Sequence, residues 1–372
     1  MKFNRYTLSD LATIKYGKNQ KKVLSDSGTV PIFGTGGLMG FATTSLYDKP
    51  SVLIGRKGTI GKVKYVEQPF WTVDTLFYTI INTDLVIPKY LFYVMSLIDL
   101  NNYNEGTTIP SLRTETLNRL EFDIPDLEEQ RKILSCLNPI DEKIELNNAI
   151  NNNLEQQAEA IFQSILSNAI TTVNLGEIAD VKGGKRLPKG VNLIDIPNAH
   201  PYIRVRDLNN ALFASLTPNY AYVDKETQKS ISRYIVSTGD VLISIVGTIG
   251  LTAIVDSTLD KANLTENCVK VTNLKHITPE YLLLYLRSQL GREAIAKGTV
   301  GAVQQKLPIK NIQAIPIPLL SEKDKNALFC TLDSIFAGIS NNVIQSAKLA
   351  SLRDTLLPRL MSGELDISDI DI

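Results

Sequence analysis

Two stretches of the chain carry the same apolar stripe, and this duplication constrains the fold more than any other feature. In residues 126–167, mostly apolar side chains recur at alternating steps of four and three from Ile133 onwards. In residues 322–361 the pattern repeats from Leu328 at a constant offset of 195. Such spacing is typical of one side of a long coiled-coil helix. One stripe alone would indicate an ordinary core helix, whereas two in phase predict a duplicated unit of globule plus long helix.

We expect the two helices to pack antiparallel through this seam. Asn147 and Asn342 occupy equivalent positions, where a polar residue lowers stability but fixes register; alternatively, both are exposed where the helices splay apart. Pro139 fits a first helical turn better than a helix interior. It therefore predicts a short helix up to Leu137, a bend, and then the long helix. The predicted seam residues are Ile140, Ile144, Asn147, Leu154, Ile161, Ile335, Ile339, Asn342, Leu349 and Leu356.

The length of the first long helix suggests a spacing. Residues 139–167 number 29, and a helix of that size extends about 43 Å at about 1.5 Å per residue. One turn of B-DNA advances about 34–36 Å. Two globules could therefore be held roughly one turn apart on one face of a duplex.

The globular stretches repeat as well. Residues 8–15 and 175–182 each predict a short amphipathic helix that leads into a loop rich in Gly and Lys, at 16–22 and 183–190. These matching starts indicate that the globules share one fold.

Further along each copy, a strand and a helix recur. Residues 52–54 and 241–243 predict buried strands, each followed by a glycine turn at which the chain reverses. Helices are expected directly after Pro88 and Pro279, because proline suits a first helical turn.

These repeats divide the chain. The second globule is longer, chiefly through residues 191–237, so the two binding surfaces are expected to differ. The tail, with Asp366, Asp369 and Asp371, is expected to fray. The predicted regions are a globule at 1–125, a helical region at 126–172, a second globule at 173–318, a second helical region at 319–361 and an acidic tail at 362–372.

Composition places the chain among folded cytoplasmic proteins. It is 44% hydrophobic and 21% charged, as in a soluble globular protein. No apolar run approaches the roughly 18–20 residues that span a bilayer, and the N-terminus lacks the apolar core of a secretory signal. Three scattered cysteines fit a reducing compartment. We therefore expect a cytoplasmic protein that does not contact a membrane.

Charge is unevenly distributed although the net charge is zero. Residues 1–64 carry 11 Lys and Arg against 3 Asp and Glu, whereas residues 126–167 carry 3 against 8. This predicts a globule that attracts a polyanion and a helix that attracts protein partners. An ordinary solvated surface would give the same counts.

Catalytic motifs are not found. The two histidines belong to no metal-ligand cluster. Residues 55–62 resemble a phosphate-binding loop, but the glycine spacing fails, and Val63 stands where a Ser or Thr would contact magnesium. No Asn/Asp-Pro-Pro-Tyr/Phe motif of adenine methyltransferases occurs. The chain is predicted to have no catalytic residue, no metal and no bound cofactor.

Basic glycine loops at matching places in both copies predict DNA recognition. Lys and Arg neutralise phosphates, glycines let backbone amides approach them, and Arg and Gln can read base edges; for any single residue, plain solvation is the alternative. The candidates in the first globule are Lys15, Lys18, Lys21, Lys22, Arg56, Lys57, Lys62, Lys64 and Arg113. Those in the second are Lys182, Lys185, Arg186, Lys189, Arg204 and Arg206 (the last two on a predicted strand), Gln304, Gln305 and Lys306.

The chain resembles the specificity (S) subunits of Type I restriction-modification enzymes over essentially all 372 residues. The most specific feature is the closing segment Leu-Arg-Asp-Thr-Leu-Leu-Pro-Arg-Leu-Met-Ser-Gly-Glu, together with the twofold arrangement. One departure is that Ile245 and Val246 replace Arg56 and Lys57 in the second copy, so no basic contact is implied at that turn. The resemblance is carried by residues 30–37, 54–62, 69–71, 127–130, 239–243 and 352–364.

The resemblance implies an α+β fold in which two target recognition domains each read one half of a split DNA sequence. Two helical regions would pack antiparallel and bind two methyltransferase (M) subunits that carry adenosylmethionine and modify adenine N6. Restriction (R) motor-nuclease subunits would add translocation and cleavage with ATP and magnesium. The chain would then be a non-catalytic recognition subunit. From the residues alone, a self-sufficient DNA-modifying enzyme and a coiled-coil assembly protein without DNA recognition remain alternatives.

Overall fold

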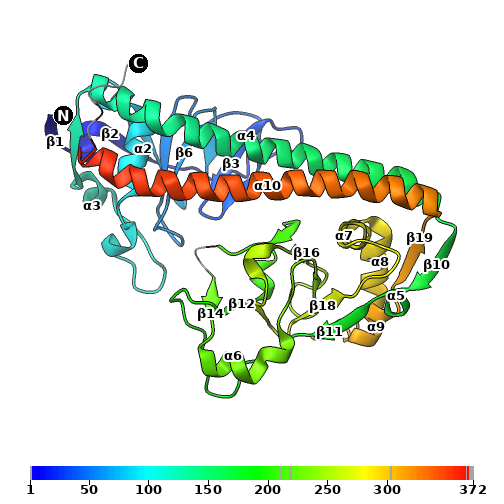
Figure 1. Ribbon diagram of the computed structural model, residues 1–372. Helices are drawn as coiled ribbons and strands as arrows, with labels where there is room; N and C mark the ends of the chain where they lie inside the picture. Colours follow the sequence, from blue (N-terminus) through cyan, green and yellow to red (C-terminus); the bar gives the residue numbers. More distant parts are fainter. Residues whose placement is uncertain (1, 210, 218–219, 302–303, 366, 368–372) are drawn as a thin grey trace. The chain divides into compact units, whose positions relative to one another are not determined.

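The computed structural model describes residues 2–209, 211–217, 220–301, 304–365 and 367 (Figure 1). The chain divides into two compact units. Unit 1 comprises Met1–Leu146 with Gln345–Ile372, and unit 2 comprises Asn147–Ile344. Each unit therefore contains one globule and one half of each long helix.

The globule of unit 1 contains three sheets. Its N-terminal strand β1 pairs with its closing strand β9, a four-stranded sheet has the order β2-β8-β5-β6, and a three-stranded sheet has the order β4-β3-β7. Only β3 and β7 run parallel among these pairs. The elements are β1 (Phe3–Thr7), α1 (Leu8–Leu11), β2 (Ala12–Tyr16), β3 (Val30–Gly34), β4 (Gly37–Ala42), β5 (Ser51–Gly55), β6 (Val63–Val66), β7 (Trp71–Thr72), β8 (Leu76–Ile81), α2 (Pro88–Ser96), the 3-10 helix η1 (Leu100–Tyr103), α3 (Thr114–Asn118) and β9 (Glu121–Pro125).

The globule of unit 2 repeats this topology. β10 pairs with β19, a sheet of order β11-β18-β15-β16 gains a fifth strand β13, and a small sheet has the order β14-β12-β17 with β12 parallel to β17. The elements are β10 (Thr171–Asn174), α5 (Leu175–Ile178), β11 (Asp180–Gly183), β12 (Pro201–Ile203), η2 (Val205–Asp207), β13 (Phe213–Ala214), β14 (Ala221–Tyr222), α6 (Lys225–Ile231), η3 (Ser232–Tyr234), β15 (Val241–Ser244), β16 (Thr252–Val255), η4 (Ser257–Leu259), β17 (Asn263–Leu264), β18 (Cys268–Thr272), α7 (Pro279–Arg287), α8 (Gln289–Gly298), α9 (Ile309–Gln313) and β19 (Pro316–Leu319).

The shared topology confirms the duplication predicted from sequence. The strands at 52–54 and 241–243 form within β5 and β15, and each reverses into an antiparallel partner. α2 and α7 begin with Pro88 and Pro279 in their first turn. β13, η2 and α6 all fall in the insertion predicted from the greater length of the second copy.

The two long helices, α4 (Leu127–Leu166) and α10 (Glu322–Met361), pack antiparallel within each unit. In unit 1 the Arg353 guanidinium lies 3.0 Å from the Asp141 carboxylate. In unit 2 the Asn342 side chain donates a hydrogen bond to Asn151 Oδ1 at 2.8 Å. Residue numbers therefore fall along α10 as they rise along α4, which confirms the predicted orientation.

The seam residues lie at or near these contacts. Asn147 is fully buried, and Asn342 is half-buried and bonded across the seam, so the alternative in which both are exposed is wrong. Ile339 is also buried, and the remaining eight predicted seam residues are half-buried. Leu332 of the predicted stripe is buried in the core of unit 2, and so are Phe162 and Phe336, which fell outside the predicted set.

The predicted bend at Pro139 is wrong, because α4 is continuous through the proline. Ser135, whose carbonyl loses its helical partner to the proline, is exposed, and so is Pro139 itself, so water can satisfy that carbonyl. On either side the helix is held by tertiary contacts, through buried Leu137 and through Asp141, which accepts hydrogen bonds from Tyr93 and Arg353. Packing outweighs the local cost of one backbone hydrogen bond.

Two further expectations need correction. The helices predicted at 8–15 and 175–182 last four residues each, because the chain continues as β2 and β11, whose pairing with β8 and β18 overrides the local helical pattern. In the acidic tail, Asp366, Asp369 and Asp371 lie outside the described residues. Ile367 is buried in the core of unit 1, so that part of the tail is packed rather than frayed.

By length and composition, α10 is the one helix among the described residues that could cross a membrane. No membrane-spanning segment is predicted from the sequence. Its Leu328 and Phe336 pack into the core of unit 2, and its Leu357 and Leu360 into that of unit 1. The core helix of a globular protein can have the same length and apolar composition, so α10 is only weak evidence for a membrane-spanning segment.

Candidate nucleic-acid interface

In unit 1, two of the predicted basic loops meet on the connection between β7 and β8, residues 72–76. The backbone N–H groups of Gly17 and Lys18 donate to carbonyls of this connection at 3.0 and 2.8 Å. Those of Arg56 and Lys57 donate to it at 2.8 and 3.2 Å. The loop after β2 and the turn after β5 are therefore held side by side.

The third loop of unit 1, residues 106–113, packs on the same turn. The Leu112 N–H donates to the Arg56 carbonyl at 2.9 Å. Arg113 follows directly, and its guanidinium lies 3.0 Å from the Glu105 carboxylate. The structure thus gathers three loops that lie far apart in sequence.

Unit 2 has the same arrangement of three loops bonded to one strand connection, which we call the loop frame. The connection between β17 and β18, residues 264–268, accepts backbone hydrogen bonds from Gly184, Lys185 and Ile245 at 3.0, 2.8 and 2.8 Å. The Leu307 N–H then donates to the Ile245 carbonyl at 3.0 Å. Each of these bonds has a counterpart in unit 1, so both globules hold three equivalent loops by the same backbone contacts.

Side chains at equivalent positions of the two frames differ. Lys57 forms a β-bridge with Ser111, and at the matching place Val246 forms one with Lys306. The second turn therefore presents apolar side chains where the first presents cations, as the comparison of the two copies predicts. Gln304, Gln305 and Lys306 are exposed at the end of the loop that follows Gly298.

Most of the predicted cations of unit 1 form no ion pair with a carboxylate among the described residues. Arg56 lies over the Tyr16 ring, 5.0 Å from its centroid, and Lys64 Nζ lies 3.8 Å from the centroid of Phe33. Burial lowers the pKa of Lys64 below its ordinary value. The remaining predicted lysines are exposed, and within the described residues none lies within ion-pair distance of a carboxylate: Lys15, Lys18, Lys21, Lys22, Lys57 and Lys62.

Several cations of unit 2 are engaged with carboxylates. Lys182 Nζ lies 3.0 Å from the Asp180 carboxylate, and Arg186 Nε lies 2.7 Å from that of Glu266. Although burial alone would raise it, the hydrogen bond from Arg186 keeps the pKa of Glu266 below its ordinary value. Lys185 instead lies over an aromatic ring, and Lys189 is exposed.

The strand predicted for Arg204 and Arg206 is wrong, because β12 ends at Ile203 and a 3-10 turn follows. Arg204 belongs to the capping box of that turn, and its Nε lies 2.9 Å from Asp207 with both side chains largely buried. Arg206 is exposed and lies 3.9 Å from the same carboxylate. The turn, rather than a strand, therefore sets which of the two guanidinium groups faces solvent.

Gly17 and Gly184 serve the fold rather than open an approach to phosphate. A Cβ at Gly17 would lie 2.0 Å from the Val73 carbonyl oxygen, and one at Gly184 would lie 2.0 Å from that of Thr265. Their N–H groups are used within the frame. The expectation that these amides face a phosphate is therefore wrong, and contacts with DNA would be left to the side chains around them.

The chain is similar to proteins of a known family. The model of the Type I restriction modification DNA specificity domain matches residues 2–156 and 169–348, one match in each copy. The chain belongs to this family. Its relatives include the MjaIX specificity subunit of Methanocaldococcus jannaschii, 23% identical over 87% of this chain and 80% of that one. The HindI specificity subunit of Haemophilus influenzae is 23% identical over 76% and 79%.

A solved structure supports the fold of this specificity-domain protein. The crystal structure of the S subunit of a Type I restriction-modification system from M. genitalium matches with a TM-score of 0.58. The match covers 97% of this chain and 96% of that one at 18% identity. The two-globule architecture is thus shared with an S subunit, although the sequences have diverged widely.

Two aromatic residues at this site are not among the site residues predicted from the sequence. Tyr16 is 51% exposed and supports the Arg56 guanidinium. The Trp71 indole N–H donates to the Lys18 carbonyl at 2.8 Å and so orients the first loop. An aromatic residue directly before the Gly17 loop is the signal that could have pointed to Tyr16; Trp71 lies too far along the chain for its contact to be read from sequence.

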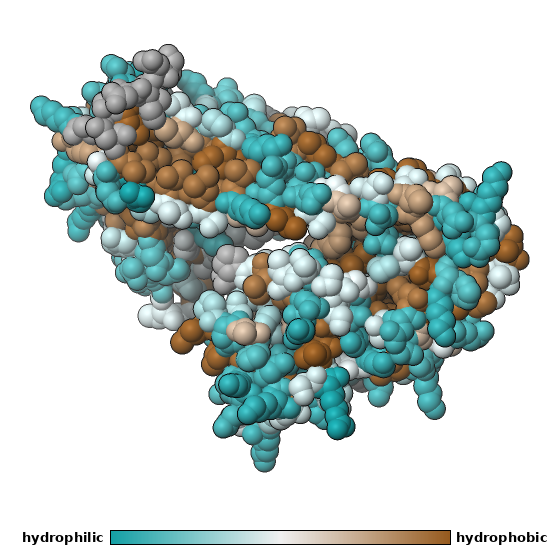
Figure 2. All heavy atoms as spheres, viewed as in Figure 1, coloured by the Kyte–Doolittle hydropathy of each residue, from teal (hydrophilic) through white to brown (hydrophobic). Residues whose placement is uncertain are grey.

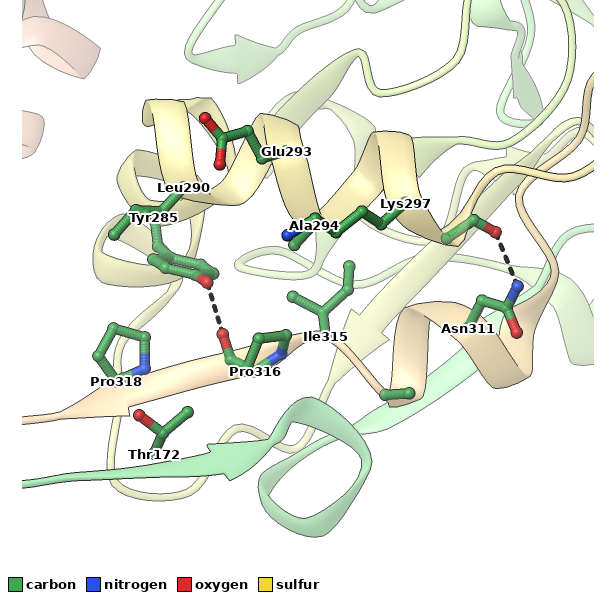
Figure 3. Close-up of a pocket in the computed structure, with 12 residues that line it drawn as sticks. Thr172, Tyr285, Leu290, Glu293, Ala294, Lys297, Asn311, Ile315, Pro316 and Pro318 are labelled. Carbon is green, nitrogen blue, oxygen red and sulfur yellow. Dashed lines mark hydrogen bonds between the residues drawn. The ribbon is translucent and has the colours of Figure 1, made fainter.

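Unit 2 also contains a hollow of about 650 Å³ (Figure 3). It is lined by α8, α9 and β19, and the Tyr285 hydroxyl at its wall donates to the Pro316 carbonyl at 2.5 Å. None of the predicted DNA-binding residues lines it. Within the described part of the chain, no three His, Cys, Asp or Glu side chains come close enough to hold a metal ion.

Proposed function

We propose that this chain is the DNA-specificity subunit of a Type I restriction-modification complex and that each globule recognises one half of a bipartite target. The duplicated loop frame carries the proposal. The same backbone hydrogen bonds hold three loops in each globule, whereas the side chains at equivalent positions differ. Reading two different base sequences requires such a constant frame with variable exposed side chains.

The charges support different roles for the two loop frames, phosphate contact in unit 1 and base contact in unit 2. Exposed lysines without carboxylate partners in unit 1 suit phosphates, which attract any mobile cation. In unit 2 the Arg186 guanidinium is held by Glu266 at 2.7 Å. A guanidinium held in one orientation suits a base edge, because readout of guanine depends on the direction of two N–H groups.

The long helices are proposed to bind two methyltransferase (M) subunits, and restriction (R) motor-nuclease subunits would join the same complex. Figure 2 shows hydrophobic residues gathered over the half of α10 that belongs to unit 1. In that unit Leu352 of α10 is 48% exposed and Leu146 of α4 is 53% exposed. Exposed apolar side chains on a helix suit a protein partner better than water.

Methylation and cleavage of DNA would then be catalysed by the partner subunits. Adenosylmethionine, ATP and magnesium would be bound by the M and R subunits, and this chain would contribute recognition without catalysis in the cytoplasm. The specificity family to which the chain belongs supports the recognition role.

Exchange of one globule tests the proposal. Residues 1–125 would be replaced by the corresponding globule of another specificity subunit, and methylated adenines would be mapped in cells that also make the methyltransferase partner. We expect one half of the target to change and the other half to stay. An unchanged target, or the loss of both halves with the complex intact, would contradict the proposal.

Two simple measurements separate the alternatives. Binding of adenosylmethionine by the purified chain alone would favour a self-sufficient DNA-modifying enzyme. Absence of duplex affinity even with the methyltransferase partner bound would favour an assembly protein without DNA recognition.

A further inference from the structure

The sheet edge that is open in unit 1 is closed in unit 2. β5 pairs with β6 as Ile54↔Val63, and β15 pairs with β16 as Ile243↔Thr252, so β6 and β16 are equivalent edge strands of the duplicated fold. In unit 2 the additional strand β13 pairs in parallel with β16. In the sheets formed by the described residues, β6 pairs with β5 alone.

Strand β13 shows how such an edge is covered. The backbone N–H groups of Ile254 and Asp256 donate to carbonyls of the β13 segment at 2.8 and 3.1 Å. On its other side, the Phe213 ring of β13 packs edge-on against Phe336 of α10, with centroids 6.0 Å apart. The strand thus fills the space between the sheet edge and the long helix.

In unit 1 the corresponding space is a groove of about 900 Å³. Residues 63–68, which are β6 and the two residues after it, line one side. The other side is formed by α2, α4 and α10, and its charged and aromatic lining residues are Lys89, Phe92, Asp141, Glu142, Glu145 and Arg353. The groove is therefore bordered by the same elements that enclose β13 in unit 2, an edge strand and a long helix.

Backbone donors point into this groove. The register makes Tyr65 and Glu67 the equivalents of Ile254 and Asp256. The Glu67 N–H has no acceptor among the described residues. A lysine on an edge strand often blocks pairing, but Lys64 Nζ lies over the Phe33 ring at 3.8 Å.

We infer that β6 accepts an extended segment of a partner polypeptide, which adds to the sheet in parallel as β13 does in unit 2. Main-chain hydrogen bonds provide the affinity in such strand addition, and side-chain pockets provide the specificity. The residue opposite Tyr65 would face Asp141, which occupies the position of Phe336 in the repeat. Asp141 is already paired with Arg353 at 3.0 Å and Lys89 at 3.9 Å, so the negative charge open to a bound segment comes from Glu142 and Glu145 beside it. With these two carboxylates, the pocket takes a Lys or Arg side chain where β13 carries Phe213.

The test uses the full chain and a peptide probe copied from the chain itself. The peptide has the sequence of residues 211–216 with Phe213→Lys and a fluorescent label, and binding is followed by anisotropy. Glu67→Pro removes one backbone donor just beyond β6, and Glu67→Ala is the matched control that keeps it. We expect saturable binding to the wild type and the control, and about fivefold weaker binding to Glu67→Pro, as for one lost hydrogen bond.

A second measurement does not depend on a proline variant. Adding the peptide to the wild-type chain should slow amide exchange at Tyr65 and Glu67. Replacing Glu142 and Glu145 together with Gln should abolish the preference for the Lys peptide over its Phe parent. Absence of saturable binding, equal binding to Glu67→Pro and Glu67→Ala, or unchanged exchange at both amides would overturn the inference. These outcomes do not involve DNA and leave the proposed function untouched.

Discussion

The loops of unit 1 lead to a quantitative prediction about the salt dependence of DNA binding. Lys18 and Lys57 are exposed, and their loops are bonded to the same β7–β8 connection, residues 72–76. Their backbone hydrogen bonds hold the frame, and their side chains point to solvent. Replacing both lysines with Gln therefore removes two charges and leaves the loop frame in place.

The size of the effect follows from counterion release. Each neutralised phosphate contributes about −0.9 to the slope of log K against log salt concentration. Loss of two contacts should reduce the slope by about 1.8 and weaken binding about 60-fold at ~0.1 M salt if affinity at ~1 M salt is unchanged. Because phosphate contacts carry no sequence information, the loss should be equal on target and unrelated duplexes.

The assay is a salt titration of duplex binding by the complex of this chain with its methyltransferase partner. The matched control replaces Lys182 and Arg186, whose charges are engaged with Asp180 and Glu266 at 3.0 and 2.7 Å. It removes the same charge from the other globule and should change the slope by less than half as much. An unchanged slope for the unit 1 variant, or an equal change for the control, would refute the reasoning.

Two predictions concern stability and thiol chemistry. Gln130 is fully buried, and its amide makes three hydrogen bonds to backbone groups; Gln130→Leu should lower the free energy of unfolding by about 3 kcal/mol, since each buried group left unpaired costs about 1–3 kcal/mol. Urea unfolding measures this, with the exposed Gln163→Leu on the same helix as a control that should change little. Burial raises the pKa of the Cys268 thiol to about 12, and only the thiolate reacts. A thiol reagent at about pH 8 should therefore modify the exposed Cys330 and spare Cys268 until the chain unfolds; labelling of both at equal rates in the native state would contradict this.

The repeated strands and turns are predictable from sequence because their signals are local. A run of buried apolar residues ends at a glycine that must turn the chain, as at β5, where Gly58 in the following turn adopts φ +87°. Proline in a first helical turn likewise marks the start of α2 and α7. Each signal needs only a few neighbouring residues, and its recurrence in the second copy removes most of the ambiguity.

The path of α4 through Pro139 is not predictable in this way, because it is decided by contacts from outside the helix. Propensity at a proline favours a break, and the opposing contacts come from Tyr93 and Arg353, 48 and 212 residues away from Asp141. The same is true of charge pairing in the candidate interface. Arg186 and Glu266 are 80 residues apart, and only the neighbouring positions of their loops make them partners.

The duplication allows more than one way of pairing the long helices, and the residues in their contact favour one of them. Because the two repeats are similar, the long helix of the first repeat could pair with the same helix of a second molecule. The helices of the second repeats could pair in the same way, and the result would be a dimer. In unit 1 the helices are joined by Asp141 and Arg353 at 3.0 Å, whereas the equivalent residues of unit 2, Phe336 and Ala158, are apolar and buried. Pairing of identical repeats would place Asp141 against Ala158 and Arg353 against Phe336, and so break this ion pair, leaving Asp141 with Tyr93 and Lys89 and Arg353 with Asp354. The ion pair, present in one unit only, therefore favours the arrangement in which one chain supplies both halves of each helix pair.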